Sequence, residues 1–291
     1  MYVFKAAVVG AGTMGGEIAQ VIAGSGLPVM LKDVDQRFVD AGLEKARQVT
    51  AGQLGGLVSK EKISQEQADT KLEETVGLIR GTLDYDGFGD VDFVIEAVPE
   101  RMDIKRAVFA ELDSVTPGHA ILASNTSSLS ITEMAEVTAR RDKVVGFHFF
   151  YPASMMRLIE VIAGEDSSEE ALQATANFAQ AIGKTPIQCG EDPGFVVNRI
   201  LNSAVSEIWR ARDEQDLSFE EVDQIVAESK AAPVGPYYLG DLLGLDTVLH
   251  VAEHLRDSYG NRFYVTPAME ERVAAGDLGQ KTGKGFYEHG G

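Results

Sequence analysis

The sequence predicts an α/β fold with a Rossmann-type, doubly wound and mainly parallel sheet, an inserted helical hairpin and a smaller all-α C-terminal domain. Three observations predict it. Short apolar runs alternate with helical patterns up to about residue 190, and a glycine-rich turn follows the first run. After about residue 192, strand patterns nearly vanish and long helical patterns follow. We therefore expect two domains, 1–191 and 192–291.

Composition narrows the class of protein. The chain has 291 residues, is 44% hydrophobic, and carries 26 Lys and Arg against 45 Asp and Glu, for a net charge of −19. It is long and apolar enough for large cores, and its charge repels nucleic acid and anionic membranes. A single cysteine, Cys189, excludes internal disulfides and zinc sites built on several thiolates. With no membrane helix, signal peptide or transit segment, we expect a cytoplasmic protein with no metal site.

The first elements form a βαβ unit. An apolar run at 2–9 predicts a strand, a glycine turn follows at 10–16, and 17–23 has a helical pattern. A second strand is expected at 27–33 and ends in an acid, Asp33. Strand, turn and helix in this order indicate a dinucleotide-binding unit, because the helix N-terminus offers free N–H groups to a pyrophosphate. The predicted cofactor residues of this unit are Gly10, Gly12, Thr13, Met14, Gly15 and Asp33.

Asp33 favours NAD over NADP. Its carboxylate can accept hydrogen bonds from ribose hydroxyls, whereas a 2′-phosphate would meet a like charge. Lys32 and Arg37 stand close in sequence and weaken this inference. An ordinary glycine-rich turn is the alternative interpretation of the whole motif.

The middle of the chain alternates helices and strands. Residues at about 36–79 have mixed charge and helical spacing, and Ser64 with Gln67 has the spacing of a capping box, so we expect a helical hairpin. Apolar runs then predict four more strands. These lie at 91–98, 119–123, 144–150 and 158–162.

The C-terminal domain is expected to be helical. Its first helix carries a wide apolar stripe at helical spacing, and Ser218 with Glu221 predicts the cap of the next helix. The stripe consists of Val196, Val197, Ile200, Leu201, Ala204, Val205, Ile208 and Trp209. Such a stripe in a domain of about 100 residues often packs against a partner chain, so we expect a homodimer through this domain. Packing on the first domain is the alternative.

Two polar residues interrupt strands that should be buried on both faces. His148 stands in the run 144–150, and Glu160 stands in 158–162. Because an unpaired buried carboxylate is costly, we expect the two to lie on neighbouring elements and to form a hydrogen bond. A paired glutamate orients the imidazole and raises its proton affinity, which suits a general base. A structural ion pair is the alternative.

A polar segment follows the predicted strand at 119–123. Asn125 and Ser127 lie at the carboxyl end of that strand, where open α/β sheets bind ligands. We expect this segment to contact a bound ligand, with Asn125 on the side of the cofactor. Local capping is the alternative for this segment.

Taken together, these motifs resemble the L-3-hydroxyacyl-CoA dehydrogenases, and among them the bacterial 3-hydroxybutyryl-CoA dehydrogenases. The resemblance runs from Gly10 to Gly285. The matching segments are Gly-Ala-Gly-Thr-Met-Gly (10–15), Ile-Glu-Ala-Val-Pro-Glu (95–100), Ala-Ser-Asn-Thr-Ser-Ser-Leu (123–129), Gly-Phe-His-Phe-Phe (146–150), Pro-Gly-Phe-Val-Val-Asn-Arg (193–199) and Lys-Thr-Gly-Lys-Gly-Phe-Tyr (281–287).

The resemblance implies an NAD-dependent oxidation of short-chain L-3-hydroxyacyl-CoA to 3-oxoacyl-CoA. His148 would take the 3-hydroxyl proton and Glu160 would be its partner, while Ser127 and Asn198 would hold the substrate oxygen. The family also implies cofactor contacts and a contact to the coenzyme A phosphates, which sequence physics does not predict. The implied cofactor contacts are Glu100, Lys105 and Lys281, and the coenzyme A contact is Lys60, for which an ordinary solvated lysine is the alternative.

Two segments depart from the family pattern. Tyr151 stands where the family has an asparagine near the nicotinamide, and two aromatics, Tyr237 and Tyr238, stand in a stretch that is usually less bulky. Cofactor orientation or acyl specificity could therefore differ. Two other functions stay open: a dehydrogenase of the same fold that acts on a 3-hydroxy acid without coenzyme A, and a non-catalytic NAD(H)-binding protein. No hydratase domain is expected in a chain of this length.

Overall fold

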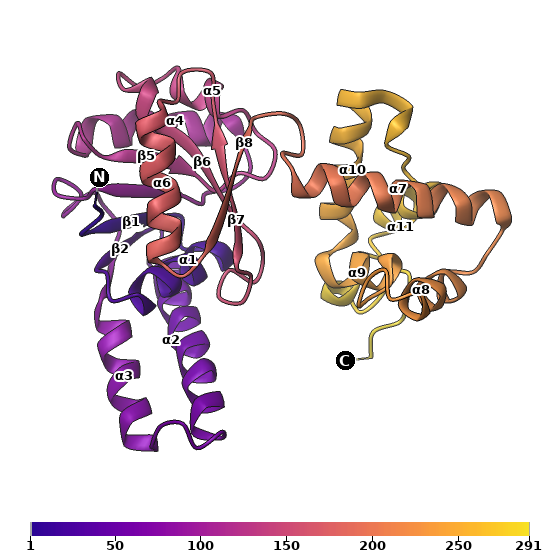
Figure 1. Cartoon of the computed structure of the whole chain (residues 1–291), viewed down its shortest axis with the longest axis horizontal. Coiled ribbons are helices and arrows are strands. Elements are labelled where there is room, and N and C mark those ends of the chain that lie inside the picture. Colours follow the sequence, from indigo (N-terminus) through magenta and orange to yellow (C-terminus); the bar gives the residue numbers. More distant parts are fainter. Residues whose placement is uncertain (1, 291) are drawn as a thin grey trace. The chain divides into compact units, whose positions relative to one another are not determined.

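The computed structural model describes residues 2–290 (Figure 1). The chain divides into two compact units, Met1–Glu191 and Asp192–Gly291. Each unit has its own hydrophobic core. Among the described residues, no helix is long and apolar enough to cross a membrane.

The first unit is built on one eight-stranded sheet in the order β3-β2-β1-β4-β5-β6-β7-β8. Strands β1 to β6 are parallel, β7 runs antiparallel to β6, and β8 is parallel to β7. The parallel part has the strand order of doubly wound dinucleotide-binding folds, so the predicted fold class is confirmed. The strands are β1 Ala6–Val9, β2 Val29–Lys32, β3 Ile79–Thr82, β4 Phe93–Glu96, β5 Ile121–Ser124, β6 Val144–Phe149, β7 Leu158–Ala163 and β8 Thr185–Gly190.

Helices bury the sheet. Alternate strand residues such as Val8, Ile95 and Phe147 form one core cluster with α1 and α6, and residues of the opposite parity such as Val94 are also fully buried. Sequential parallel strands connect by right-handed crossovers, and the strand order reverses at β1, so α1 and α4 cover opposite faces. The helices of this unit are α1 Thr13–Gly24, α2 Gln36–Val58, α3 Gln65–Gly77, α4 Met102–Val115, α5 Ile131–Ala135 and α6 Glu169–Ala181, with a 3₁₀ turn at Arg141–Lys143.

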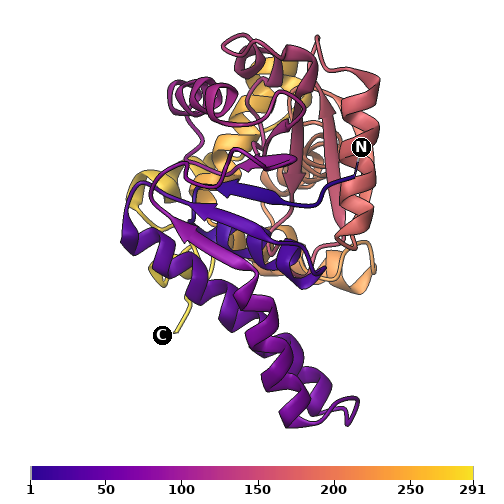
Figure 2. The same cartoon turned by 90° about the vertical axis from the view of Figure 1, so that its left-hand side faces the viewer.

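The predicted helical hairpin is present as α2 and α3. Ser64 caps α3 in a reciprocal capping box with Gln67, as the sequence predicts. The turn between the two helices lies at the end of the hairpin that is farthest from the sheet (Figures 1 and 2).

Two edge strands, β3 and β8, are absent from the sequence prediction. β3 is only four residues long and contains Arg80 and Gly81, so its sequence has no apolar run that would predict a strand. β8 begins with Thr185 and Pro186 and is partly exposed, because it closes the sheet at one edge. The first strand is also shorter than predicted: it begins at Ala6, and both Tyr2 and Phe4 are exposed.

The second unit is helical, as predicted, and its core is centred on Trp209, Tyr237 and Phe286. The capping box of Ser218 and Glu221 is present. The predicted apolar stripe on α7 is wrong in part: Asn202, Ser206 and Trp209 are buried, whereas Ile200 is 66% exposed and Leu201 is 42% exposed. The elements are α7 Val197–Gln215, α8 Phe219–Glu228, α9 Pro236–Leu243, α10 Leu245–Tyr259, α11 Pro267–Ala275 and two 3₁₀ turns, Gly260–Arg262 and Gln280–Thr282.

Candidate active site

The glycine turn after β1 is shaped by close backbone contacts. Gly10 has φ +101°, and a Cβ at this position would lie 2.4 Å from the carbonyl oxygen of Ala97, which follows β4. A Cβ on Gly15 would lie 1.7 Å from the carbonyl oxygen of Gly10. These two glycines therefore let the turn fold tightly at the point where the strand order reverses, which is where open α/β sheets bind their ligands.

Gly12 differs from these two, because neither its backbone conformation nor its surroundings require a glycine. A Cβ there would meet nothing within 4 Å, and φ is −65°. Gly12 is also the N-cap of α1 and gives that helix no side-chain hydrogen bond, and the first turn of α1 holds no acidic residue. An open approach to an uncapped helix N-terminus fits the pyrophosphate of a dinucleotide. These residues therefore fit NAD.

Asp33 connects the end of β2 with the glycine turn. Its carboxylate accepts hydrogen bonds from the backbone N–H of Ala11 at 2.7 Å and of Val34 at 2.7 Å. The two neighbouring cations are engaged elsewhere. Lys32 is buried with its ammonium 4.5 Å from the centre of the Tyr85 ring, and Arg37 forms a bidentate pair with Asp35. Neither cation neutralises the Asp33 carboxylate, which would therefore repel a 2′-phosphate. This removes the objection that the sequence raised to a preference for NAD over NADP.

His148 and Glu160 form the hydrogen bond that the sequence predicts. The antiparallel register of β6 and β7 places them directly opposite each other. His148 Nδ1 lies 2.8 Å from Glu160 Oε2, and both side chains are buried. The ring of Phe150 lies 4.6 Å from the imidazole, centre to centre. A carboxylate on Nδ1 fixes the orientation of the ring and directs Nε2 away from Glu160.

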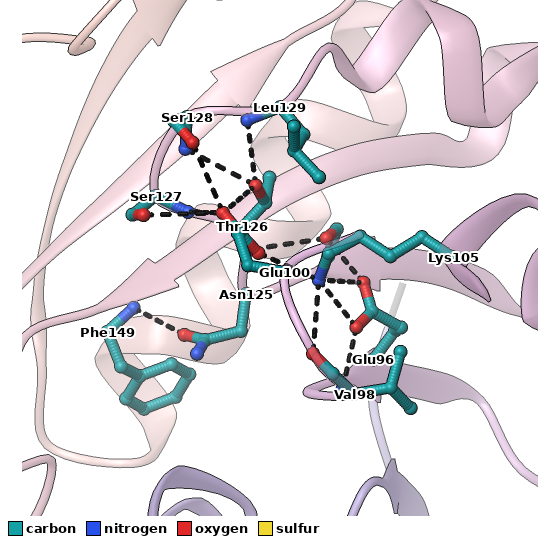
Figure 3. Close-up of polar contacts among 11 residues, drawn as sticks. Glu96, Val98, Glu100, Lys105, Asn125, Thr126, Ser127, Ser128, Leu129 and Phe149 are labelled. Carbon is teal, nitrogen blue, oxygen red and sulfur yellow. Dashed lines mark hydrogen bonds and ion pairs between the residues drawn. The ribbon is translucent and has the colours of Figure 1, made fainter. Parts of the chain in front are cut away.

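A second buried ion-pair cluster joins the end of β4 and the loop that follows it to α4 (Figure 3). Lys105, from α4, is buried, and its ammonium lies 2.7 Å from Glu96 Oε1 and 3.1 Å from Glu100 Oε2. Glu96 also accepts hydrogen bonds from Ser124 Oγ at 2.6 Å and from the N–H of Val98 at 2.7 Å. Every group around Glu96 donates, which is the environment of an ionised carboxylate.

The pKa values of the two glutamates are shifted in opposite directions. Burial raises the pKa of Glu96, and Lys105 and the hydrogen bond from Ser124 only partly oppose this. Burial would also raise the pKa of Glu100, but the Lys105 ammonium and the hydrogen bonds from Thr126 and Ser127 outweigh it and lower that pKa. Glu100 is therefore held as a carboxylate.

Glu100 in turn holds the loop after β5. Its Oε1 accepts hydrogen bonds from Thr126 Oγ1 at 2.6 Å, from the N–H of Ser127 at 2.9 Å and from Ser127 Oγ at 3.3 Å (Figure 3). Lys105 is buried and forms ion pairs with both glutamates, so in this structure it holds the Glu100 carboxylate in place.

Asn125 links that loop to the strand of His148. Its side-chain oxygen accepts a hydrogen bond from the backbone N–H of Phe149 at 2.9 Å, next to the histidine. Because β1, β4, β5 and β6 are parallel, their carboxyl ends share one edge of the sheet. The structure thus brings the glycine turn, Glu100, Ser127 and His148 to that edge, as expected for a site that combines a dinucleotide with acid–base chemistry.

The other residues singled out from the sequence belong to other segments of the chain. Lys60 is exposed in the turn between α2 and α3, away from the sheet (Figure 1). Asn198, in the first turn of α7, and Lys281, in a 3₁₀ turn, belong to the second unit. The Lys281 ammonium lies 2.5 Å from Asp246 Oδ1. Tyr151 is half exposed and is the second residue after β6, the strand that carries His148.

Glu96 is a residue of this cluster that the sequence analysis missed. Its signal was available, since an acid interrupts the apolar run 91–98 in the same way that Glu160 interrupts 158–162. A buried carboxylate in a parallel strand demands a partner, and α4 supplies it.

Comparison with known proteins agrees with this geometry. A family model described as "3-hydroxyacyl-CoA dehydrogenase, NAD binding domain" matches residues 5–192, and the model of that family's C-terminal domain matches residues 194–289. A "Probable 3-hydroxybutyryl-CoA dehydrogenase" of Deinococcus radiodurans is 39% identical over 98% of this chain and 100% of its own length. The crystal structure of an (S)-3-hydroxybutyryl-CoA dehydrogenase from Ralstonia eutropha has a TM-score of 0.90 and 37% identity, and covers 100% of both chains.

Longer relatives match as well. The fatty acid oxidation complex subunit alpha of Psychrobacter sp. is 41% identical over 98% of this chain, which spans only 38% of that subunit. Since the two family models together cover both units, the chain belongs to the family of NAD-dependent 3-hydroxyacyl-CoA dehydrogenases, and its first unit carries the NAD-binding domain of that family.

Proposed function

We propose that this protein interconverts short-chain L-3-hydroxyacyl-CoA and 3-oxoacyl-CoA with NAD. The proposal rests on the buried contact between His148 and Glu160. This contact lies near the carboxyl ends of the parallel strands, where the glycine turn also lies. A sensor that only binds NAD(H) needs no imidazole held in one orientation by a buried carboxylate. An acid–base step on a hydroxyl group needs one.

In the proposed reaction, His148 takes the proton of the substrate 3-hydroxyl group through Nε2. Glu160 accepts the hydrogen bond of Nδ1–H and stabilises the imidazolium that forms when the proton arrives. NAD, when bound, supplies the acceptor for the hydride that leaves C3. In the direction of reduction, His148 returns its proton to the carbonyl oxygen.

The loop after β5 is proposed to hold the substrate oxygen. Ser127 would contact this oxygen together with Asn198, and Glu100 fixes the Ser127 backbone for this task. A preformed hydrogen bond to the oxygen whose charge changes in the transition state lowers the barrier. Asn125, Glu100, Lys105 and Lys281 are proposed to act on the cofactor side, with Lys105 acting through Glu100. Lys60 is proposed to meet the coenzyme A phosphates.

The test is NADH consumption with acetoacetyl-CoA, with NADPH and free acetoacetate run in parallel at equal concentrations. We expect turnover with NADH and the thioester, and at least about tenfold less in either parallel arm. Equal turnover of free acetoacetate would replace the proposal with a dehydrogenase that does not recognise coenzyme A. Binding of NADH without turnover of any substrate would replace it with a non-catalytic role. The same assay over a series of 3-oxoacyl chain lengths tests the short-chain preference.

A homodimer formed through the second unit is also proposed. Two large apolar side chains of α7, Ile200 and Leu201, are exposed, while the opposite side of the same helix packs into the core of its own unit. Exposed apolar surface of this kind is stabilised by burial against a second copy. A cytoplasmic location stays a prediction from the sequence.

A further inference from the structure

The loop that joins β6 to β7 also joins the two members of the proposed catalytic pair. It covers residues 150–157, between His148 on one strand and Glu160 on the next. It begins at the sheet edge that carries the glycine turn, and Tyr151 is its second residue. Much of this loop is exposed, including Tyr151, Met155 and Met156. Apolar packing therefore holds the loop at Ala153, which is buried in the core, and not at those three side chains.

Buried Glu17 holds the middle of this loop from one side. Glu17 lies in the second turn of α1, two residues after Gly15, and is 1% exposed. Its Oε2 accepts hydrogen bonds from the backbone N–H of Ser154 at 3.2 Å and from Ser154 Oγ at 3.3 Å. Its Oε1 lies 3.2 Å from the Lys45 ammonium of α2.

Buried Lys184 holds the same segment by its carbonyl groups. This lysine precedes β8, and its ammonium donates to the carbonyl oxygens of Ala153 at 2.5 Å and Met156 at 2.7 Å. Burial lowers the pKa of Lys184, and the negative charge of Glu17 partly opposes that shift.

The two contacts are complementary in charge and in hydrogen bonding. A carboxylate takes the N–H and hydroxyl of Ser154, and an ammonium takes the carbonyl groups on either side of that residue. Burying each charge is costly, and hydrogen bonds to the loop recover part of that cost. Neither residue belongs to the proposed cofactor and substrate contacts. Their shared target is the loop.

We propose that Glu17 and Lys184 are positioning residues that fix the 150–157 loop, and with it Tyr151 and the end of the His148 strand, relative to the dinucleotide helix α1. The inference rests on the proposed function for its catalytic consequence. The restraint on the loop itself does not depend on that function.

The first test compares three variants. Glu17→Ala removes the acceptor for Ser154, Glu17→Gln keeps an acceptor oxygen without the charge, and Lys45→Met removes the same ion pair without touching the loop. With acetoacetyl-CoA and NADH, we expect Glu17→Ala to lower kcat about tenfold, since small misplacements of reacting groups are costly. The KM for NADH should change less than about threefold. Glu17→Gln should recover most of kcat, and Lys45→Met should match the wild type.

The second test needs no activity. Arg157 ends the loop and is exposed, so the rate of limited trypsin cleavage after it reports how firmly the loop is held. We expect faster cleavage in Glu17→Ala and Lys184→Met, and wild-type cleavage in Lys45→Met. Thermal unfolding of each variant separates loss of the fold from release of the loop.

The outcomes separate the two proposals. Wild-type kcat and wild-type cleavage in Glu17→Ala would overturn the positioning role, as would equal losses in Glu17→Ala and Lys45→Met, which would assign the effect to the ion pair. Faster cleavage with an unchanged kcat would overturn the catalytic part of the inference. A wild-type enzyme without turnover would overturn the proposed function, while the cleavage arm would still measure the restraint.

Discussion

His148 and Glu160 are paired residues of adjacent antiparallel strands, and their side chains meet at 2.8 Å inside the sheet. The contact exists because β7 reverses direction after five successive parallel pairings. In this register the two side chains point to the same face of the sheet. The carboxylate of Glu160 therefore contacts the imidazole of His148 directly. The pair is thus held by backbone hydrogen bonds of the sheet.

The first prediction concerns the imidazole. His148→Gln keeps a polar side chain but cannot accept the substrate proton at neutral pH, so we expect turnover to fall by about 100-fold or more while NADH binding stays within about twofold. Steady-state kinetics and NADH fluorescence titration measure the two quantities. Unchanged turnover would remove His148 from the mechanism.

The sequence predicted this contact because both residues break apolar runs, and a buried charge in a strand requires a partner. The same argument applies to the hairpin, where Ser64 and Gln67 cap a helix by local hydrogen bonds. Local signals of this kind survive without knowledge of the fold.

What the sequence could not predict depends on contacts between distant segments. The strand β3 is short and carries Arg80, and it becomes a strand only because β2 offers an edge for pairing. Glu100 reaches Ser127 across 27 positions of the chain, and Glu17 reaches Ser154 across 137. Neither pair has a periodicity that would reveal it. The buried side of α7 likewise holds Asn202 and Ser206, which hydrogen-bond to backbone oxygens, so an apolar stripe was a poor guide there.

The second prediction concerns cofactor choice. Asp33→Asn keeps an acceptor for the Ala11 N–H but removes the charge that would repel a 2′-phosphate. We expect the ratio of kcat/KM for NADPH over NADH to rise about tenfold. Arg37→Met is the matched control, because it removes an exposed cation four residues after Asp33. It should leave the ratio within about twofold. A ratio unchanged in Asp33→Asn would remove Asp33 from nucleotide selection.

The third prediction concerns the buried ammonium. Lys105→Met leaves Glu96 and Glu100 without their shared cation, so we expect the free energy of unfolding to fall by about 3–5 kcal/mol. Arg101→Met removes the exposed ion pair between the N-cap of α4 and Asp103 in its first turn, and it should leave the free energy of unfolding nearly unchanged. Urea unfolding at pH 7 measures both. Equal, small losses would show that the glutamates are neutral in the fold.

The fourth prediction concerns pH. The folded state lowers the pKa of Glu100 below its ordinary value of 4.5, so the carboxylate adds stability above that value and loses it as the pH falls through the folded pKa. We expect Glu100→Gln to be less stable than the wild type by about 1 kcal/mol at pH 7, discounted because Glu100 is one-third exposed. The difference should shrink as the pH falls below 4.5 and through the folded pKa of Glu100. Unfolding curves at pH 7, 5 and 3.5 check this, and a difference that does not vary with pH would contradict it.

The last prediction concerns assembly. Burial of about 100 Å² of apolar surface is worth roughly 2.5 kcal/mol, so two exposed large side chains on each copy are enough to shift a dimer equilibrium. Ile200→Glu with Leu201→Glu places two charges on that surface of α7, and like charges meet if the same surface pairs in both copies. In sedimentation velocity, we expect a wild-type dimer and a monomeric double variant. Ile225→Glu, an exposed apolar position on α8, is the matched control and should stay dimeric. A dimer that survives the double variant but not the control would move the interface to α8, and a monomeric wild type would end the proposal.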